Sequence, residues 1–277
     1  MSAFQALVLG IIQGLSEFLP ISSSGHLVIV PFIFGWREPT LAFDVAVHFG
    51  TLIAVVWVFR EKVLAVVRTI FTWGRATVEE RALVRLLAIG TIPAVAVGVA
   101  FDHAVSDSFQ RPVIVSLLLG VTGYFLLASE SVYEKRGEQA KVAGGSLRTL
   151  EEIKTGDAAA IGIAQAVAIL PGISRSGSTI GAGMRLGLTR ETAAAFSFLL
   201  SIPVLLGATV YKLPDITHEA SRGSADAFII GLVASGVTGF FAIKWFLRMI
   251  ERVGLRPFGV YLFFVMMAGL LTGLARG

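Results

Sequence analysis

The sequence predicts an all-α integral membrane protein, with six transmembrane helices and two re-entrant helix hairpins arranged as two repeats of inverted topology. Three observations carry this prediction. First, 55% of the 277 residues are hydrophobic and only 15% are charged, with a mean hydropathy of +0.79, which is typical of membrane proteins. Second, two apolar segments are broken in the middle by Pro, Ser and Gly. Third, these two segments resemble each other in sequence.

Six apolar segments are long enough to cross a bilayer core of roughly 30 Å, which takes about 20 helical residues. They are Thr40–Phe59, Leu83–Phe101, Val113–Ser129, Thr192–Tyr211, Ala227–Leu247 and Phe258–Leu274. The longest polar stretch, Ser129–Asp157, is too short for a soluble domain and is expected to be a loop. We therefore expect one polytopic domain, with a first repeat over about 1–130, a loop over about 131–156 and a second repeat over about 157–277.

Two further apolar segments, Ala3–Trp36 and Ala158–Gly187, do not fit as simple spans. Each is interrupted by a cluster of Pro, Ser and Gly. Unpaired backbone groups are prohibitive against lipid, so such a break is tolerated only inside protein or beside a water-filled cavity. Each segment is therefore predicted to form a re-entrant hairpin of two helices.

The two hairpins align with each other when the sequence is shifted by 152 residues, which places Gly10 on Gly162. Gly10–Gln13 then matches Gly162–Gln165, and Ile21–Gly25 matches Ile173–Gly177 without a gap. Each repeat has one hairpin and three spans, and because three is odd the two halves have opposite orientation. Such inverted repeats bring two discontinuous helices together near the membrane midplane, where the sites of these folds are built.

The distribution of basic residues predicts the orientation. Seventeen of the 23 Lys and Arg residues fall on one side of the predicted spans, and Arg175 lies within the second hairpin. The other side, which carries both chain ends, holds Arg37, Arg111, Lys212, Arg222 and Arg276. The positive-inside rule makes the basic side cytoplasmic, so the mouth of the first hairpin faces outward. Topology thus explains the net charge of +4, and nucleic-acid binding is not expected.

Candidate functional residues are concentrated in the first hairpin. Gln13 and Glu17 are four residues apart, so they share one helix face. A carboxylate in an apolar segment is a functional candidate, although Glu17 could instead be a buried carboxylate that caps the neighbouring turn. After the break come Pro20, Ser22, Ser23, Ser24, Gly25 and His26. A histidine beside three hydroxyls and a carboxylate favours catalysis over a structural role.

The second hairpin contains a candidate anion site. One arginine and four hydroxyls lie at a predicted helix start, in the run Ser174, Arg175, Ser176, Gly177, Ser178 and Thr179. Free backbone N–H groups and the helix dipole favour negative charge there, and a guanidinium binds phosphate through two hydrogen bonds. In the alternative, the serines cap the helix and Arg175 pairs with Glu17. Two facing helix starts and an arginine suit a diphosphate.

Weaker signals lie elsewhere in the chain. Asp44 and His48 are four residues apart in a predicted span, where they either line the cavity or hydrogen-bond to the neighbouring hairpin. Asp157 and Glu191 are expected to serve as negative charges at helix N-termini. Three glycines, Gly231, Gly236 and Gly239, are expected to allow close helix packing. Because the chain has no cysteine, thiolate catalysis and Cys-based zinc sites are excluded, and no nucleotide-binding loop appears.

The two hairpins resemble the signatures of the bacterial undecaprenyl-diphosphate phosphatase family, also known as the bacitracin-resistance or BacA family. Gln13–His26 is similar to that family's first motif, in which a Glu precedes Pro-x-Ser-Ser-x-Gly-His, and Pro171–Gly177 is similar to the second. The resemblance implies removal of the terminal phosphate of undecaprenyl diphosphate, which recycles the lipid carrier for peptidoglycan and confers bacitracin resistance. It also implies a site open to the outer side of the bacterial plasma membrane.

Six residues match functional positions of the family: Glu17, Ser23, His26, Ser174, Arg175 and Thr179. The helix starts add Ser22, Ser24, Gly25, Ser176 and Gly177 as expected phosphate contacts. Mg²⁺ or Ca²⁺ is expected to assist, with Glu17 as the first ligand. Gln13 would be a second and weaker one, since many members of the family have Glu at this position. The implied partners are a polyprenyl diphosphate and the bilayer, and the family also allows a homodimer.

The mechanism expected from these residues places the diphosphate on Arg175 and the helix-start N–H groups. Ser23 or His26 attacks the terminal phosphorus, and we favour Ser23 as nucleophile with His26 as base and Glu17 orienting the histidine. The competing prediction is a lipid-phosphate flippase, because inverted repeats with broken helices are typical of secondary carriers.

Overall fold

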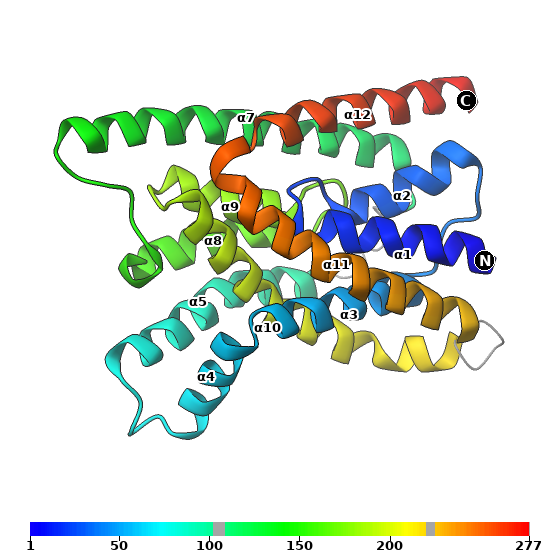
Figure 1. Ribbon diagram of the computed structural model, residues 1–277. Helices are drawn as coiled ribbons and strands as arrows, with labels where there is room; N and C mark the ends of the chain where they lie inside the picture. Colours follow the sequence, from blue (N-terminus) through cyan, green and yellow to red (C-terminus); the bar gives the residue numbers. More distant parts are fainter. Residues whose placement is uncertain (102–108, 220–224, 277) are drawn as a thin grey trace.

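The computed structural model describes residues 1–101, 109–219 and 225–276, and these residues form helices joined by short connections (Figure 1). The all-α prediction is confirmed for this part of the chain, whose only extended pairing is an isolated bridge between Arg148 and Leu188. Five helices are long and apolar enough to cross a membrane. They are α5 (Val78–Ala100), α7 (Pro112–Val142), α10 (Arg190–Glu219), α11 (Ala225–Val253) and α12 (Arg256–Arg276).

The remaining predicted span, Thr40–Phe59, corresponds to α3 (Leu41–Val58), which is bent by 88° against α4 (Arg60–Phe71). Taken together, α3 and α4 are long and apolar enough to count as a sixth candidate span. The apolar run stops at Phe59 because Arg60, Glu61 and Lys62 follow it directly. Charged residues are costly in the bilayer core, and α4 turns aside where they begin.

Both predicted breaks are present, and each separates two short helices. The first lies between α1 (Ala3–Phe18) and α2 (Ser23–Phe34), the second between α8 (Thr155–Val167) and α9 (Arg175–Arg185). With 16, 12, 13 and 11 residues, each of these helices is shorter than a full span.

The first hairpin folds back on itself, because the ring of Phe4 in α1 contacts the ring of Trp36 just after α2, at 6.3 Å between centroids. The two ends of the second hairpin are linked through the loop that precedes it, because the backbone N–H of Arg148, seven residues before α8, donates to the carbonyl of Gly187, just after α9, at 2.9 Å. The two breaks meet in the interior, where Ser176 Oγ donates to the carbonyl of Leu19 at 2.9 Å.

The prediction of a loop over residues 131–156 is wrong for residues 131–142, because α7 continues as a helix to Val142. The segment after Ser129 is rich in Glu, Lys and Gln, which are good helix formers even where they are exposed. The extension is also anchored, since the buried carboxylate of Glu130 pairs with Arg190 and accepts the N–H of Leu255 at 2.7 Å. Sequence patterning did not reveal this anchor, because its partners lie in distant helices.

Arg148 joins the remaining loop to the second hairpin. Its guanidinium donates to Asp157 through Nη1 at 2.5 Å and Nη2 at 3.1 Å, and Nη2 also donates to the carbonyl of Leu186 at 2.7 Å. The hydrogen bonds to Asp157 raise the pKa of Arg148 above its ordinary value. Asp157 also accepts the N–H of Lys154 at 2.8 Å, which confirms its predicted place at a helix N-terminus.

We expect Asp157→Asn to destabilise the protein by about 1–2 kcal/mol, because the partly buried Arg148 loses the charge of its partner, although the amide oxygen can still accept the N–H of Lys154. The readout is the thermal unfolding midpoint of the purified protein in detergent. The matched control is Glu134→Gln, whose ion pair with Arg256 at 2.6 Å is exposed, so that its loss should cost under about 0.5 kcal/mol. Equal midpoints for the two variants would contradict a structural role for the Arg148–Asp157 pair.

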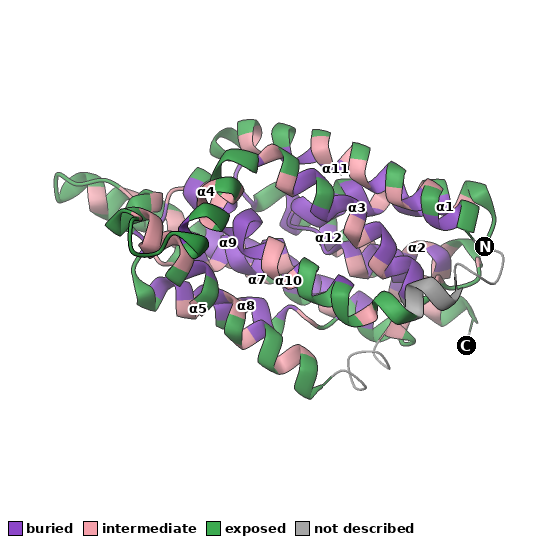
Figure 2. Ribbon diagram, turned by 90° about the horizontal axis from the view of Figure 1, so that it is seen from below, coloured by how far each residue is buried: buried purple, intermediate pink, exposed green. Residues whose placement is uncertain are grey.

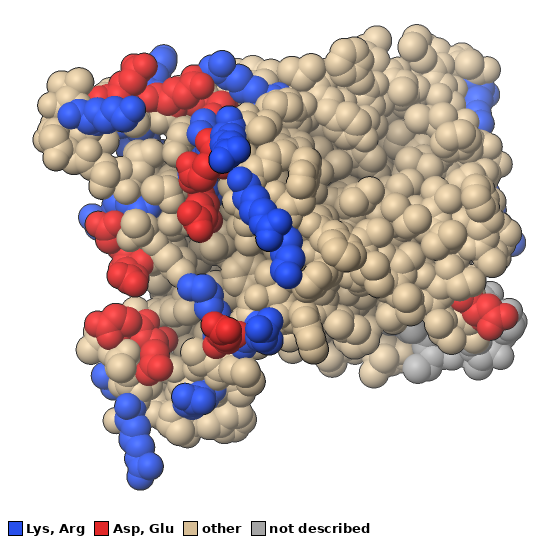
Figure 3. Space-filling model, in the orientation of Figure 1, with Lys and Arg blue, Asp and Glu red and all other residues tan. Residues whose placement is uncertain are grey.

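The charged residues gather at one end of the molecule, around α4, the C-terminal half of α7 and the start of α8 (Figure 3). Both chain ends lie at the opposite end (Figure 1). This separation agrees with the predicted division of basic residues between two sides, although Arg222 lies outside the described residues. Buried residues concentrate in the middle of the bundle (Figure 2), while the spans expose large apolar side chains such as Ile92, Val99, Phe241 and Phe264. Such an exterior suits contact with lipid.

The predicted close approach of helices at glycines is confirmed. A Cβ added to Gly10 in α1 would lie 2.5 Å from the carbonyl oxygen of Gly231 in α11. Cβ atoms on Gly236 and Gly239 would lie 3.2 Å and 3.3 Å from the nearest atoms of their neighbours. The second hairpin packs in the same way, because a Cβ on Gly162 in α8 would lie 2.6 Å from the carbonyl oxygen of Gly90 in α5. These contacts hold both broken helices tightly against full-length spans.

Candidate active site

The beginnings of α2 and α9 face the interior, and both are capped by serine. Ser22 Oγ accepts the N–H of Gly25 at 3.3 Å, and Ser174 Oγ accepts the N–H of Gly177 at 3.0 Å. Ser22 has a φ of 67°, which makes it the one non-glycine residue with positive φ in the described part of the chain. A side chain held in this region costs on the order of 1 kcal/mol or more, and such strain concentrates at functional sites. The serine capping considered as an alternative for the second hairpin is thus present in both hairpins, and at Ser22 it accompanies a conformation that a cap alone does not require.

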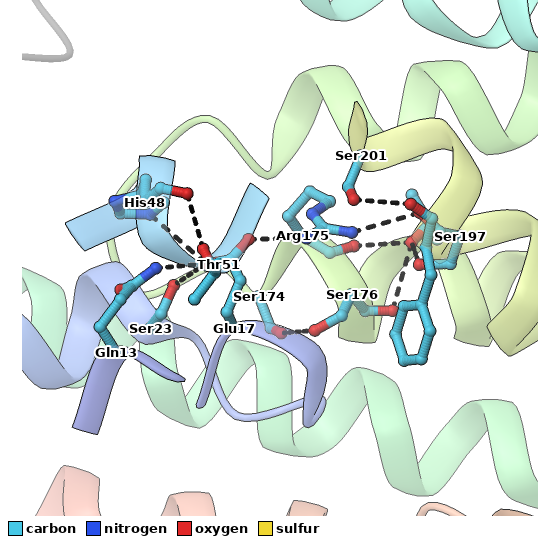
Figure 4. Close-up of polar contacts among 12 residues, drawn as sticks. Gln13, Glu17, Ser23, His48, Thr51, Ser174, Arg175, Ser176, Ser197 and Ser201 are labelled. Carbon is cyan, nitrogen blue, oxygen red and sulfur yellow. Dashed lines mark hydrogen bonds and ion pairs between the residues drawn. The ribbon is translucent and has the colours of Figure 1, made fainter. Parts of the chain in front are cut away.

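Glu17 is the centre of the polar network between the two hairpins (Figure 4). Its Oε2 accepts Ser23 Oγ at 2.6 Å and Gln13 Nε2 at 2.9 Å, and Oε1 accepts Arg175 Nη2 at 2.6 Å. The carboxylate is buried, with only 5% of its surface exposed. The shared face of Gln13 and Glu17 is confirmed, and the pairing of Glu17 with Arg175 that we considered as an alternative is formed.

Arg175 is the first residue of α9, and a second contact orients it. Its Nη1 donates to the carbonyl of Ser197 in α10 at 3.2 Å. Thr179, one turn later in α9, donates to the carbonyl of Arg175 at 2.8 Å and contacts Ser197 Oγ at 2.6 Å. The guanidinium is therefore held between α1 and α10 by one contact to each helix.

A cavity of about 240 Å³ opens beside this network. Its polar side is lined by seven of the predicted site residues, Glu17, Ser22, Ser23, Ser24, Ser174, Arg175 and Ser176, together with Asp44 and His48. The rest of its wall is mostly apolar and includes Ala94, Ile169, Val204, Leu205 and Ala208. A polar recess bounded by an apolar wall suits a lipid with a charged head group.

Five predicted site residues lie outside the cavity lining: Gln13, Gly25, His26, Gly177 and Thr179. The hydroxyl of Thr179 is fully buried and braces α9 against α10, while the two glycine N–H groups are occupied by the serine caps. Their predicted roles toward phosphate remain predictions, and in this structure the contacts of these residues are structural.

His26 does not contact Glu17, contrary to the expected arrangement. Its Nδ1 lies 2.8 Å from the carbonyl oxygen of Ser22, and its Nε2 lies 2.8 Å from the hydroxyl of Tyr261 in α12. The two rings are also stacked, with 5.7 Å between centroids and 6° between planes. Tyr261 is 235 residues away in the chain, so local sequence could not indicate this partner. His26 thus holds the strained Ser22 carbonyl in place, and its catalytic assignment remains a prediction.

His48 is the histidine that faces Glu17, with 3.4 Å between Nε2 and Oε2. Its Nδ1 lies 2.6 Å from the carbonyl oxygen of Asp44, one turn earlier in α3. Both options left open for Asp44 and His48 therefore apply in part, since both side chains line the cavity and His48 also contacts the first hairpin. The four-residue spacing of Asp44 and His48 was the available signal, but it could not show which helix face meets Glu17.

The residues predicted to hold a divalent cation fit it only partly. In the described ranges, no three or more His, Asp or Glu side chains come close enough to enclose a metal ion. Both oxygens of Glu17 already accept hydrogen bonds. Gln13 Oε1 is different, because it is buried and has no hydrogen-bond partner. This amide oxygen could therefore serve as a ligand near Glu17, as could Asp44 Oδ1 in the cavity lining, which also has no hydrogen-bond partner.

Comparison with known proteins agrees with this geometry. The family model described as bacitracin resistance protein BacA matches residues 6–268. The chain belongs to the BacA family. It is 42% identical over 270 residues to an undecaprenyl-diphosphatase of Pelotomaculum thermopropionicum, covering 98% of this chain and 95% of the relative. An undecaprenyl-diphosphatase of Gemmatimonas aurantiaca is 40% identical over 265 residues, 94% of each chain. One of Alcanivorax borkumensis is 42% identical over 265 residues, 94% of this chain and 95% of that relative.

The BacA-family assignment covers both hairpins and the cavity between them. Because the match starts at residue 6 and ends at residue 268, it includes the Glu17 network and the Arg175 helix start, as well as α12 with Tyr261. The protein is accordingly a multi-pass membrane protein of this family, and the cavity between its two hairpins is the candidate active site.

Proposed function

We propose that this protein is an undecaprenyl-diphosphatase. It hydrolyses the bond between the two phosphates of undecaprenyl diphosphate, releasing inorganic phosphate and undecaprenyl phosphate. The single observation that carries this assignment is the Glu17 carboxylate, which joins Ser23 at the start of α2 to Arg175 at the start of α9 beside an apolar wall. By returning the lipid carrier to use, the enzyme serves peptidoglycan synthesis and confers resistance to bacitracin.

The diphosphate is bound by the positive ends of two helices and by Arg175. The first N–H groups of a helix have no partner within it, and together with the helix dipole they favour an anion. Arg175 is held by Ser197 on one side, so its remaining donors are available to phosphate oxygens once Glu17 exchanges its contact. Phosphoryl transfer depends mainly on such positioning and charge compensation.

The reaction begins with attack of Ser23 Oγ on the terminal phosphorus. The Ser23 O–H bond breaks, its proton moves to Glu17 Oε2 at 2.6 Å, and the leaving undecaprenyl phosphate takes the electron pair of the broken P–O bond. Water then hydrolyses the phosphoserine. Glu17 replaces His26 as the proposed base, because both ring nitrogens of His26 have other partners. Recovery of phosphate on His26 rather than on Ser23 after rapid quenching would contradict this order.

A divalent cation, Mg²⁺ or Ca²⁺, is proposed to accompany the diphosphate and to offset its negative charge. Gln13 Oε1 would hold it, together with Glu17 once the carboxylate releases one of its donors. This assignment rests on the unpartnered amide oxygen and on the affinity of these hard cations for oxygen ligands.

We further propose that the site opens to the outer side of the plasma membrane and that the fold consists of two inverted repeats. The cavity includes Asp44 in the first turn of α3 and Phe109 just before α7, and both of these helices begin toward the end that carries both chain termini (Figure 1). The basic residues concentrate at the other end, as expected for a cytoplasmic face. Inverted repeats are supported by the matching serine caps at Ser22 and Ser174. A homodimer, which the family resemblance allows, is not required for this site.

The test is phosphate release from undecaprenyl diphosphate by the purified protein in detergent, with and without a chelator. We expect release by the wild type, loss in Arg175→Ala and strong reduction in chelator. Release that is unchanged in chelator would remove the cation from the proposal. If the wild type releases no phosphate but moves a lipid phosphate across the membrane of reconstituted vesicles, the protein is a lipid-phosphate flippase.

The apolar wall is expected to hold the first isoprene units of the substrate. Ala208→Trp fills this wall from α10, so kcat/KM for undecaprenyl diphosphate should fall about tenfold, or about 1.4 kcal/mol. The control is Val210→Trp, two residues along α10, whose side chain is 64% exposed and lies outside the cavity lining. An equal effect of both substitutions would show that the chain leaves the site by another route.

A further inference from the structure

The helix α4 presents its apolar side chains away from the protein. Leu64, Val67 and Phe71 are three and four residues apart, so they form one apolar stripe along this helix. All three are exposed, Phe71 with 84% of its surface and Leu64 with 63%. Thr69, on the opposite side of the helix, is only 1% exposed. In a water-soluble protein the apolar stripe of a surface helix faces the core, so α4 has the reverse arrangement.

The direction of α4 also differs from that of the spans. α3 packs against the spans α10 and α11, and α4 is bent by 88° against α3. The bend occurs where Arg60, Glu61 and Lys62 end the apolar run. At this point α4 lies at the end of the molecule where the charged residues gather, opposite both chain ends (Figures 1 and 3). A helix that is perpendicular to a span at this end lies along the plane of the membrane.

Positive charge flanks the apolar stripe. Residues 60–75 contain four basic residues and one acidic residue. Arg60 and Arg68 lie four residues before and after Leu64, so both are on the side of the stripe. Lys62 lies on the opposite side of the helix. The exposed ion pair of Arg60 with its neighbour, at 4.0 Å, is the one ion pair that the structure describes in this segment. The exposed guanidinium of Arg68 is therefore available to a partner outside the protein.

Exposed tryptophans lie beyond both ends of α4. Trp57 precedes the bend and Trp73 follows the helix. Tryptophan is enriched where the acyl chains of a bilayer meet the head groups. An apolar stripe with flanking basic side chains and tryptophan is typical of a helix that lies within this interface. Anionic lipid head groups attract basic side chains close to the membrane surface. These features therefore fit a membrane surface that contains anionic lipids.

We propose that α4 is an interfacial helix that binds the anionic cytoplasmic surface of the membrane. Leu64, Val67 and Phe71 enter the boundary between head groups and acyl chains, while Arg60 and Arg68 contact the phosphates of anionic lipids. No residue of α4 lines the candidate active-site cavity, so this surface is separate from that site. The inference rests on the proposed orientation, in which the basic end is cytoplasmic, and not on the proposed phosphatase activity.

The test uses spin labels, because the chain has no cysteine of its own. Phe71→Cys on the stripe and Lys62→Cys on the opposite side each carry one nitroxide, in separate samples of the full chain. The vesicles contain phosphatidylcholine and phosphatidylglycerol. Oxygen collides with labels in lipid, whereas a water-soluble nickel complex collides with labels in water. We expect the ratio of oxygen to nickel collisions to be about tenfold higher at residue 71 than at residue 62. Equal ratios would overturn the inference.

The role of the anionic lipid is tested with vesicles of phosphatidylcholine alone. Without phosphatidylglycerol, we expect the collision ratio at residue 71 to fall about threefold, because the charge attraction is lost. Arg68→Gln, added to Phe71→Cys, should roughly halve this dependence on phosphatidylglycerol, whereas Lys62→Gln should leave it unchanged. A ratio that does not depend on phosphatidylglycerol would overturn the binding of anionic lipid, as would equal effects of the two substitutions.

The same samples separate lipid from a protein partner. Low collision rates with both reagents at residue 71 would mean that a second copy of the chain covers the stripe, which overturns the inference. Because both leaflets of these vesicles contain the same lipids, the result does not depend on the orientation of the protein. Phosphate release by the same samples measures the proposed function separately, so the failure of one is distinguished from the failure of the other.

Discussion

Arg175→Lys is expected to lower kcat/KM for undecaprenyl diphosphate by about 10²–10³-fold, or about 3–4 kcal/mol of transition-state stabilisation. The guanidinium reaches the carbonyl of Ser197 with Nη1 and Glu17 Oε1 with Nη2, so it has to be planar and forked to hold its position. A lysine ammonium keeps the charge but cannot make both contacts and also present two parallel donors to a phosphate. Phosphate release at saturating and at low substrate concentration would measure this loss.

The control for this prediction lies in the same helix. Arg185, the last residue of α9, stacks over the ring of Phe125 at 5.7 Å and lies outside the cavity lining. Arg185→Lys should therefore keep kcat/KM within about twofold. It is a matched control because it replaces the same side chain by the same one and, like Arg175→Lys, conserves the positive charge. If Arg175→Lys retained a third or more of the wild-type activity, the charge alone would suffice, and the fixed fork would have no role in catalysis.

Gly162→Leu is expected to destabilise the protein by about 3 kcal/mol or more, the largest effect on stability that we predict. A Cβ at this position would lie 2.6 Å from the carbonyl oxygen and 2.8 Å from the Cα of Gly90. Both are backbone atoms, so no side chain can rotate away, and α8 has to move off α5. Because α8 leads into the break before Arg175, activity should fall with stability. The thermal midpoint in detergent should drop by roughly 6–12 °C.

Gly207→Leu in α10 is the matched control, since a Cβ there meets no atom within 4 Å. It should leave the midpoint within about 2 °C, because it adds an apolar side chain to an exposed position and improves helix propensity. Similar midpoints for Gly162→Leu and Gly207→Leu would mean that α8 can separate from α5 at little cost. The close glycine contact would then not be what positions the second hairpin.

The sequence by itself determined the class of the fold and the places where its helices break. Hydropathy marks the long apolar helices, because the bilayer sets their length and composition directly. The breaks at Pro, Ser and Gly in Ala3–Trp36 and Ala158–Gly187 were readable for the same reason, since lipid does not tolerate unpaired backbone groups. The shared face of Gln13 and Glu17 followed from helical periodicity. The motifs around Ser23 and Arg175 indicated the family.

Only the tertiary structure decided which partner each polar side chain takes. Glu17 meets His48 and not His26, because the rotation of α3 about its axis turns His48 toward α1, while Tyr261 of α12 holds His26. The helical end of α7 depends on the Glu130–Arg190 pair and therefore on how α10 packs against it. Spacing along a chain determines which residues share one helix face. The face that a helix presents to its neighbours depends on packing between segments far apart in sequence, and in this protein that packing selects the histidine that contacts Glu17.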